Sequence, residues 1–100
     1  MNDISKVSDI TAADLADYIR LSEVTADDTK TLNLMLKVAK SYIMSYTGHT
    51  ADELDDYEDF VIVVFVLVQD MWDNRTLYVD TANLNNVVEN ILGMHSVNLL

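Results

Sequence analysis

The chain contains no cysteine and no proline, and it has only two glycines in 100 residues. Without cysteine it can form neither a disulfide nor a thiolate metal site. An all-β sandwich or barrel needs more turn residues than this, so the composition favours an all-α fold. One hundred residues, half of them hydrophobic, suffice for one domain around a single packed core.

Positive charge is also scarce. The chain has six lysines and arginines and 17 aspartates and glutamates, which gives a formal net charge of -11. A protein that binds nucleic acid by neutralising phosphates needs a basic surface, so this charge argues against a helix-turn-helix DNA binder. The apolar run over residues 60–68 is about half of the roughly 20 residues that a bilayer span requires. The first ten residues, MNDISKVSDI, do not resemble a secretory signal. We therefore expect a soluble protein without membrane contact.

The apolar run itself, FVIVVFVLV, is typical of a buried strand when it is read alone. Its surroundings favour a helix, because acids precede it and apolar residues continue beyond it at i, i+3, i+4, i+7 and i+8. These positions are Val64, Leu67, Val68, Met71 and Trp72. A helix that is apolar almost all round has to be enclosed. The sequence thus predicts a bundle of about four to five helices around a central helix over about 57–74.

Capping residues predict the other helices. Thr11 begins a short helix to about residue 21, and Thr25 begins a longer one that ends at Gly48 in a left-handed cap. Thr50 and Glu53 form a capping box at the start of a short turn.

A last helix begins at Asn83 or Asn85 and is expected to stop at Gly93. Outside the central helix, the residues expected in the core are Leu36, Ala39, Ile43, Val88 and Ile91. Residues 1–10 and about 94–100 are expected to be a flexible arm and a flexible tail of the single domain, 1–100.

The sequence contains no residue pattern that is typical of a catalytic site or a metal site. The acids over 52–59 do not fit a calcium loop, which needs a glycine turn that this segment lacks, so we interpret them as helix caps and a solvated face. His49 and His95 have no partner at the spacing of a catalytic triad or a zinc motif, and no glycine-rich phosphate loop is present. We expect no enzyme, no catalytic residue, no metal and no cofactor.

Two segments carry a resemblance to a known family. The segment AKSYIMSYTG, residues 39–48, ends a long helix, and WDNR, residues 72–75, ends the apolar helix that follows the acidic turn. Set between a short capped helix and a late helix to residue 92, they resemble the small head–tail connector (adaptor) proteins of tailed bacteriophages and prophages, often labelled DNA-packaging proteins. The resemblance covers residues 9–93, whereas the tail MHSVNLL lacks the basic residue that usually follows the last helix in that family.

The resemblance implies a subunit that assembles into a homo-oligomeric ring under the portal, at the head–tail junction of the virion, after synthesis in the host cytoplasm. The ring would extend the DNA channel and form a platform for neck, head-closure or tail proteins. DNA would pass through it without specific binding, because an acidic lumen offers phosphates no opposite charge. A small acidic regulatory or DNA-mimic protein that binds a basic host partner is the alternative that the charge leaves open.

Head-to-tail assembly requires two different and complementary surfaces on each subunit. We expect Lys37 and Lys40, on the exposed side of the second helix, to meet the acidic turn of a neighbouring copy. Arg75 either pairs with an acid or caps carbonyls within the chain, or it contacts a neighbour. The acidic members of this predicted interface are Asp52, Glu53, Asp55 and Asp56.

Overall fold

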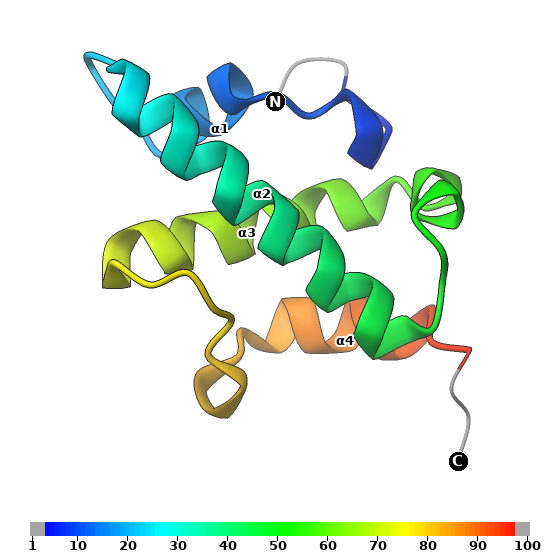
Figure 1. The fold of residues 1–100 in the computed structure, drawn as a ribbon. Helices are drawn as coiled ribbons and strands as arrows, with labels where there is room; N and C mark the ends of the chain where they lie inside the picture. Colours follow the sequence, from blue (N-terminus) through cyan, green and yellow to red (C-terminus); the bar gives the residue numbers. More distant parts are fainter. Residues whose placement is uncertain (1–3, 98–100) are drawn as a thin grey trace.

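The computed structural model describes residues 4–97 and shows a small all-α bundle, as the sequence predicts (Figure 1). Within these residues the chain forms no strand. The α-helices are α1 (Ala12–Tyr18), α2 (Ala26–Thr47), α3 (Asp59–Asn74) and α4 (Asn86–Met94). Short 3-10 helices precede or join them: η1 (Val7–Asp9), η2 (Asp52–Asp56) and η3 (Thr81–Asn83).

Local capping explains where α1 and α2 begin. At the start of α1, the Thr11 hydroxyl accepts a hydrogen bond from the Asp14 backbone N–H, and the Asp14 carboxylate accepts one from the Thr11 N–H. Thr25 and Asp28 form the same capping box at the start of α2. At the other end of α2, Gly48 adopts the left-handed conformation, with φ of 82°.

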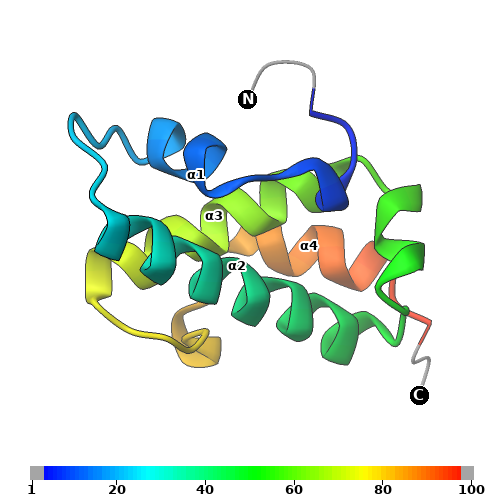
Figure 2. The ribbon, with the colours of Figure 1, turned by 45° about the horizontal axis from the view of Figure 1, so that its top comes forward.

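Helix α3 is the hub of the bundle. It contacts α1, α2 and α4, and Figures 1 and 2 show α2 crossing it while α1 and α4 lie on either side. Residues 60–68 are therefore helical, and most of their side chains are buried because neighbouring helices enclose them. Within this run Val66 is only partly buried, and Ile62 is exposed, with 43% of its side chain accessible. No helix within residues 4–97 has both the length and the hydrophobicity needed to cross a membrane.

The core contains most of the residues that the apolar spacing predicts. Trp72 and Ile91 differ from the expectation, since they are partly exposed and pack against the core from its edge. Trp72 lies in the last turn of α3, where fewer helices surround it. The buried members of the predicted set are Leu36, Ala39, Ile43, Val64, Leu67, Val68, Met71 and Val88.

Both ends of the described chain pack against the bundle, so the predicted flexible arm is wrong for residues 4–10. Val7 and Ile10 are 2% and 4% exposed and belong to the core. The predicted flexible tail is likewise wrong for residues 94–97, because α4 continues through Gly93 to Met94 and the Val97 N–H donates to the Thr47 carbonyl oxygen at 2.7 Å. The expectations for residues 1–3 and 98–100 lie outside the described residues.

Candidate functional site

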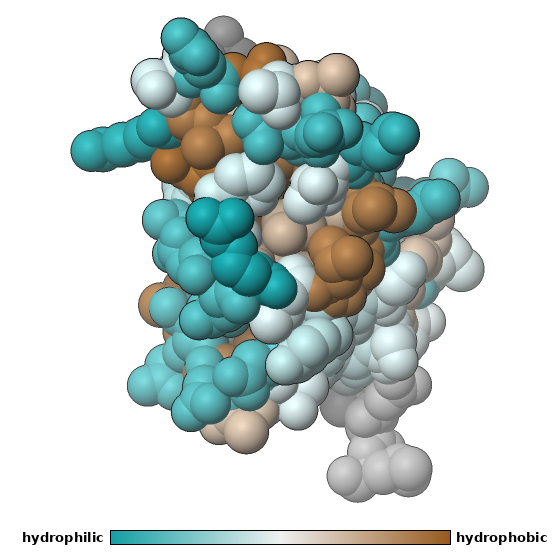
Figure 3. Space-filling model, turned by 60° about the vertical axis from the view of Figure 1, so that its left-hand side comes forward, coloured by the Kyte–Doolittle hydropathy of each residue, from teal (hydrophilic) through white to brown (hydrophobic). Residues whose placement is uncertain are grey.

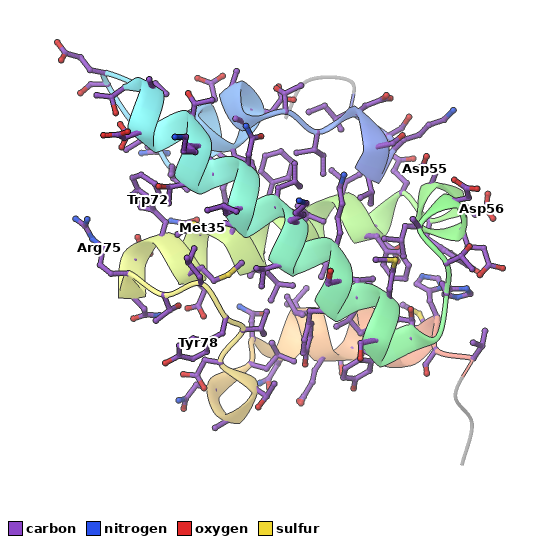
Figure 4. The ribbon with its side chains drawn as sticks, in the orientation of Figure 1. Met35, Asp55, Asp56, Trp72, Arg75 and Tyr78 are labelled. Carbon is purple, nitrogen blue, oxygen red and sulfur yellow. The ribbon has the colours of Figure 1, made fainter. Side chains whose placement is uncertain are left out.

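The residues predicted to form a subunit interface are divided between two ends of the molecule. Figure 4 shows Arg75 beside Trp72, at the C-terminal end of α3, and Asp55 and Asp56 at the opposite end. The second group belongs to η2, which immediately precedes α3. Since α3 has 16 residues and rises about 1.5 Å per residue, about 24 Å of helix separates the two ends.

The acidic turn, residues 52–56, is held in place by its own chain. Leu54 is 1% exposed and anchors the turn in the core. The Glu53 carboxylate accepts a hydrogen bond from the Thr50 N–H at 2.8 Å, which is the largest cause of the lowered pKa of Glu53. Asp55 accepts from the hydroxyl and the N–H of Ser8, at 2.7 and 2.9 Å. Two of the four predicted acids therefore have structural roles, whereas Asp52 and Asp56 are exposed.

Lys40, which is expected to meet the acidic turn of a neighbouring copy, lies beside the acidic turn of its own chain. It is half-buried and lines a cavity of about 150 Å³ together with Ser8 and Asp55. Its charge contributes to the lowered pKa of Asp55, after the larger effect of the hydrogen bonds from Ser8. Lys37, one turn earlier, is exposed and remains available to a partner.

The bond between Ser8 and Asp55 predicts a pH-dependent contribution to stability. Because the pKa of Asp55 is lowered in the folded state from its ordinary 3.8, the contribution is present above that pH and is lost as the pH falls through the folded-state value. We expect Asp55→Asn to lower the free energy of unfolding by no more than about 1 kcal/mol at pH 7, since solvent screens this partly exposed site. The loss should become smaller as the pH is lowered from 7 towards 2. Urea titrations at the two pH values measure it.

Asp52→Asn is the matched control, because it removes the same charge from an exposed residue of the same turn. Equal pH dependence in the two variants would contradict the role of the Ser8 hydrogen bonds.

Arg75 ends α3 in an unusual backbone conformation. Its φ is 57°, in the left-handed region, and the Thr76 N–H donates to the Met71 carbonyl oxygen at 3.0 Å, as in a Schellman motif. The ion pairs found within residues 4–97 both involve histidine, so Arg75 pairs with no described acid. Its guanidinium is exposed, while its backbone carries out the capping.

Two concave surfaces lie between α2 and the chain around the end of α3. A pocket of about 250 Å³ lies between α2 and the end of α3, and its lining includes Met35, Trp72 and Arg75. Beside it, a shallow groove of about 490 Å³ separates α2 from the segment over 77–79; the residues that line it are Lys37, Val38, Ser41, Tyr42, Ser45, Leu77, Tyr78 and Val79. Figure 3 shows apolar side chains exposed among hydrophilic ones on this side of the molecule.

Leu77 and Tyr78 stand out at the edge of that groove, with 52% and 64% of their side chains exposed. They lie between α3 and η3, outside any helix. No helical spacing or motif in the sequence points to Leu77 and Tyr78, although two large side chains close to Arg75 in an irregular segment are a signal of an exposed contact surface.

A histidine cluster joins three elements and was also missed. The Nε2 of His49, which is 8% exposed, donates to the His95 carbonyl oxygen at 2.7 Å, and the Nε2 of His95 lies 2.8 Å from the Asp59 carboxylate. The rings of Tyr57 and Phe60 pack against both imidazoles. The cluster fastens the end of α4 to the end of α2 and the start of α3. Within residues 4–97, no group of three or more histidines or acids is placed to hold a metal ion.

Comparison with protein-family models finds no match, and comparisons with curated proteins and with solved structures find no significant match. The surfaces of the chain itself therefore carry the functional argument.

Proposed function

We propose that the chain is a head–tail connector subunit of a tailed bacteriophage or prophage, which forms a homo-oligomeric ring under the portal. The main support is the separation of two unlike surfaces along α3. One end carries Arg75, Lys37 and exposed apolar side chains beside the exposed acids Asp70 and Asp73, and the other end carries the exposed acids Asp52 and Asp56 without an exposed apolar pair among the described residues. A ring needs such a pair, because each subunit contacts one neighbour through one surface and the next neighbour through the other.

The charge of the chain fits this function. DNA must move through a connector without adhering to it, and an acidic ring offers phosphates no cations whose binding would release counterions. The net charge of -11 also makes free copies repel one another in dilute solution at low salt. The portal would organise the copies into a ring inside the virion, and the outer face of the ring would receive a neck, head-closure or tail protein.

The competing function is that of a small acidic regulatory or DNA-mimic protein that binds a basic host partner. Such a protein needs its acids on the binding face, and it has no use for exposed apolar residues beside two cations at the opposite end. The two functions differ in the partner that binds, and this difference can be measured.

Co-sedimentation with the portal protein encoded in the same genome tests the proposal. We expect the chain to sediment with assembled portal in a fixed ratio and to show no binding to duplex DNA at 0.1 M salt. Tight, salt-dependent duplex binding would support a DNA-binding protein instead. Binding to a basic host protein without portal binding would support the regulatory alternative.

Arg75 offers a matched test of the assembly surface. We expect Arg75→Gly to raise the concentration needed for assembly on the portal about fivefold, the size of effect that one surface charge pair can supply. Arg20→Gly is the control, because Arg20, the residue after the C-cap of α1, has a φ of 62°, close to the 57° of Arg75. The two variants relieve similar backbone strain, so only the loss of an interface charge should separate them. Equal assembly by both, measured by sedimentation, would remove Arg75 from the interface.

A further inference from the structure

Leu77 and Tyr78 form an apolar knob that the described residues, 4–97, leave largely uncovered. They are 52% and 64% exposed and lie in the irregular segment after α3. The cations near this knob are Arg75, two residues before Leu77, and Lys37, which lines the same groove as both knob residues. Two of the nearby acids serve local caps: Asp28 accepts from the Thr25 N–H, and Asp80 accepts from Asn83. Asp73, two residues before Arg75, is an exposed acid on the same end of α3.

A pocket lined by three apolar residues and two carboxylates lies at the other end of α3. It has a volume of about 380 Å³, and its lining consists of Ile4, Glu58, Asp59, Val61 and Ile62. This volume is within the range of about 300–1,000 Å³ that holds small ligands, so an aromatic ring and a neighbouring aliphatic side chain fit its scale. Ile62 is the one strongly exposed side chain of the apolar run over 60–68. The central helix is thus uncovered at this pocket.

The knob of one chain cannot reach the pocket of the same chain. The pocket involves the first turn of α3, the knob follows its last turn, and the helix between them is about 24 Å long. Figures 1 and 2 show the segment after α3 and the start of α3 at opposite ends of the molecule. Any contact between the two surfaces therefore joins two copies through different surfaces, which makes it heterologous.

Charge favours the same pairing. The cations Arg75 and Lys37 are beside the knob, whereas Glu58 and Asp59 line the pocket and the acidic turn is adjacent to it. A contact between two knobs would bring cations together, and a contact between two pockets would bring carboxylates together. Like-charge contacts of this kind oppose symmetric pairing.

We propose that Leu77 and Tyr78 of one copy insert into the pocket around Ile62 of the next copy, with Arg75 and Lys37 facing its carboxylates. This contact rests on the proposed ring and names the two surfaces that build it. Repetition of the contact gives a closed ring or an open helical filament, according to the angle between successive copies. Assembly on the portal favours the closed ring over the open filament.

The absence of cysteine allows a direct test by cross-linking. Ile62→Cys and Tyr78→Cys are prepared as separate full-length variants, mixed, and treated with a short bismaleimide both alone and on assembled portal. We expect a covalent dimer from the mixture and none from either variant alone. A mixture of Ile62→Cys with Val24→Cys, another exposed apolar position, is the matched control and should stay monomeric. Circular dichroism verifies that each variant is folded.

The outcomes separate this contact from the proposed function. Cross-linking of Tyr78→Cys alone would indicate a symmetric contact and overturn the proposal. Portal binding without a cross-link in the mixture would also overturn it, while the connector function stands. A cross-link without portal binding would support the contact and remove the connector function. Adding Leu77→Asp, an exposed substitution, to the Tyr78→Cys variant should reduce the cross-linked dimer at least tenfold, and an unchanged yield would contradict the knob.

Discussion

Replacing Phe60 by alanine is expected to lower the free energy of unfolding by about 3–5 kcal/mol, the range for a large aromatic residue in a packed core. Phe60 is fully buried in the first turn of α3, and its ring contacts those of His49, Tyr57 and His95. Its removal creates a cavity at the point where α2, α3 and α4 are joined. Urea titration followed by the helical circular dichroism signal measures the change.

Ile62→Ala is the control, because Ile62 is in the same helix but 43% exposed. We expect it to lose less than about 1 kcal/mol of stability, as exposed substitutions do, while weakening the contact between copies. The two variants thus distinguish the role of α3 in the core from its role in the contact between copies. Equal stability losses in the two variants would contradict the burial pattern on which the hub of the fold depends.

The double variant Val7→Ala and Ile10→Ala is expected to lose about 3–6 kcal/mol, since it removes two apolar side chains from the core. A domain of this size has a total stability of about 5–15 kcal/mol. The loss is therefore a large fraction of the total, and the variant should unfold in mild denaturant. The same urea titration measures this loss.

Lys6→Ala with Asp9→Ala is the matched control, because both side chains belong to the same segment and are exposed. We expect it to change stability by no more than about 0.5 kcal/mol. If the two double variants were equally stable, residues 4–10 would behave as a flexible arm after all.

The sequence predicts the helices well where the signals are local. Thr25 and Gly48 mark the two ends of α2 because a side-chain cap and a left-handed residue are determined within a few positions. The helical character of 60–68 is also predictable, since acids before the run and regular spacing after it outweigh the β propensity of its residues. Gly93 misleads, because glycine is tolerated within a helix and no left-handed conformation is needed there.

Features that depend on tertiary contacts could not be predicted in this way. Val7 and Ile10 are isolated apolar residues in a polar stretch, and only the folded bundle provides the surface that buries them. The hydrogen bond between His49 and His95 spans 46 positions, so no spacing rule reveals it. Lys40 and Asp55 become neighbours only when η2 folds back beside α2. Likewise, only the folded structure shows that the two candidate contact surfaces lie at opposite ends of α3.

Electron microscopy of the chain mixed with the portal of its own genome tests the central claim most directly. The connector function predicts a ring of this protein on one face of the portal, coaxial with the DNA channel, in which each subunit contacts its two neighbours through opposite ends of α3. Bare portals beside monomers, under conditions where the chain is folded and in excess, would contradict it.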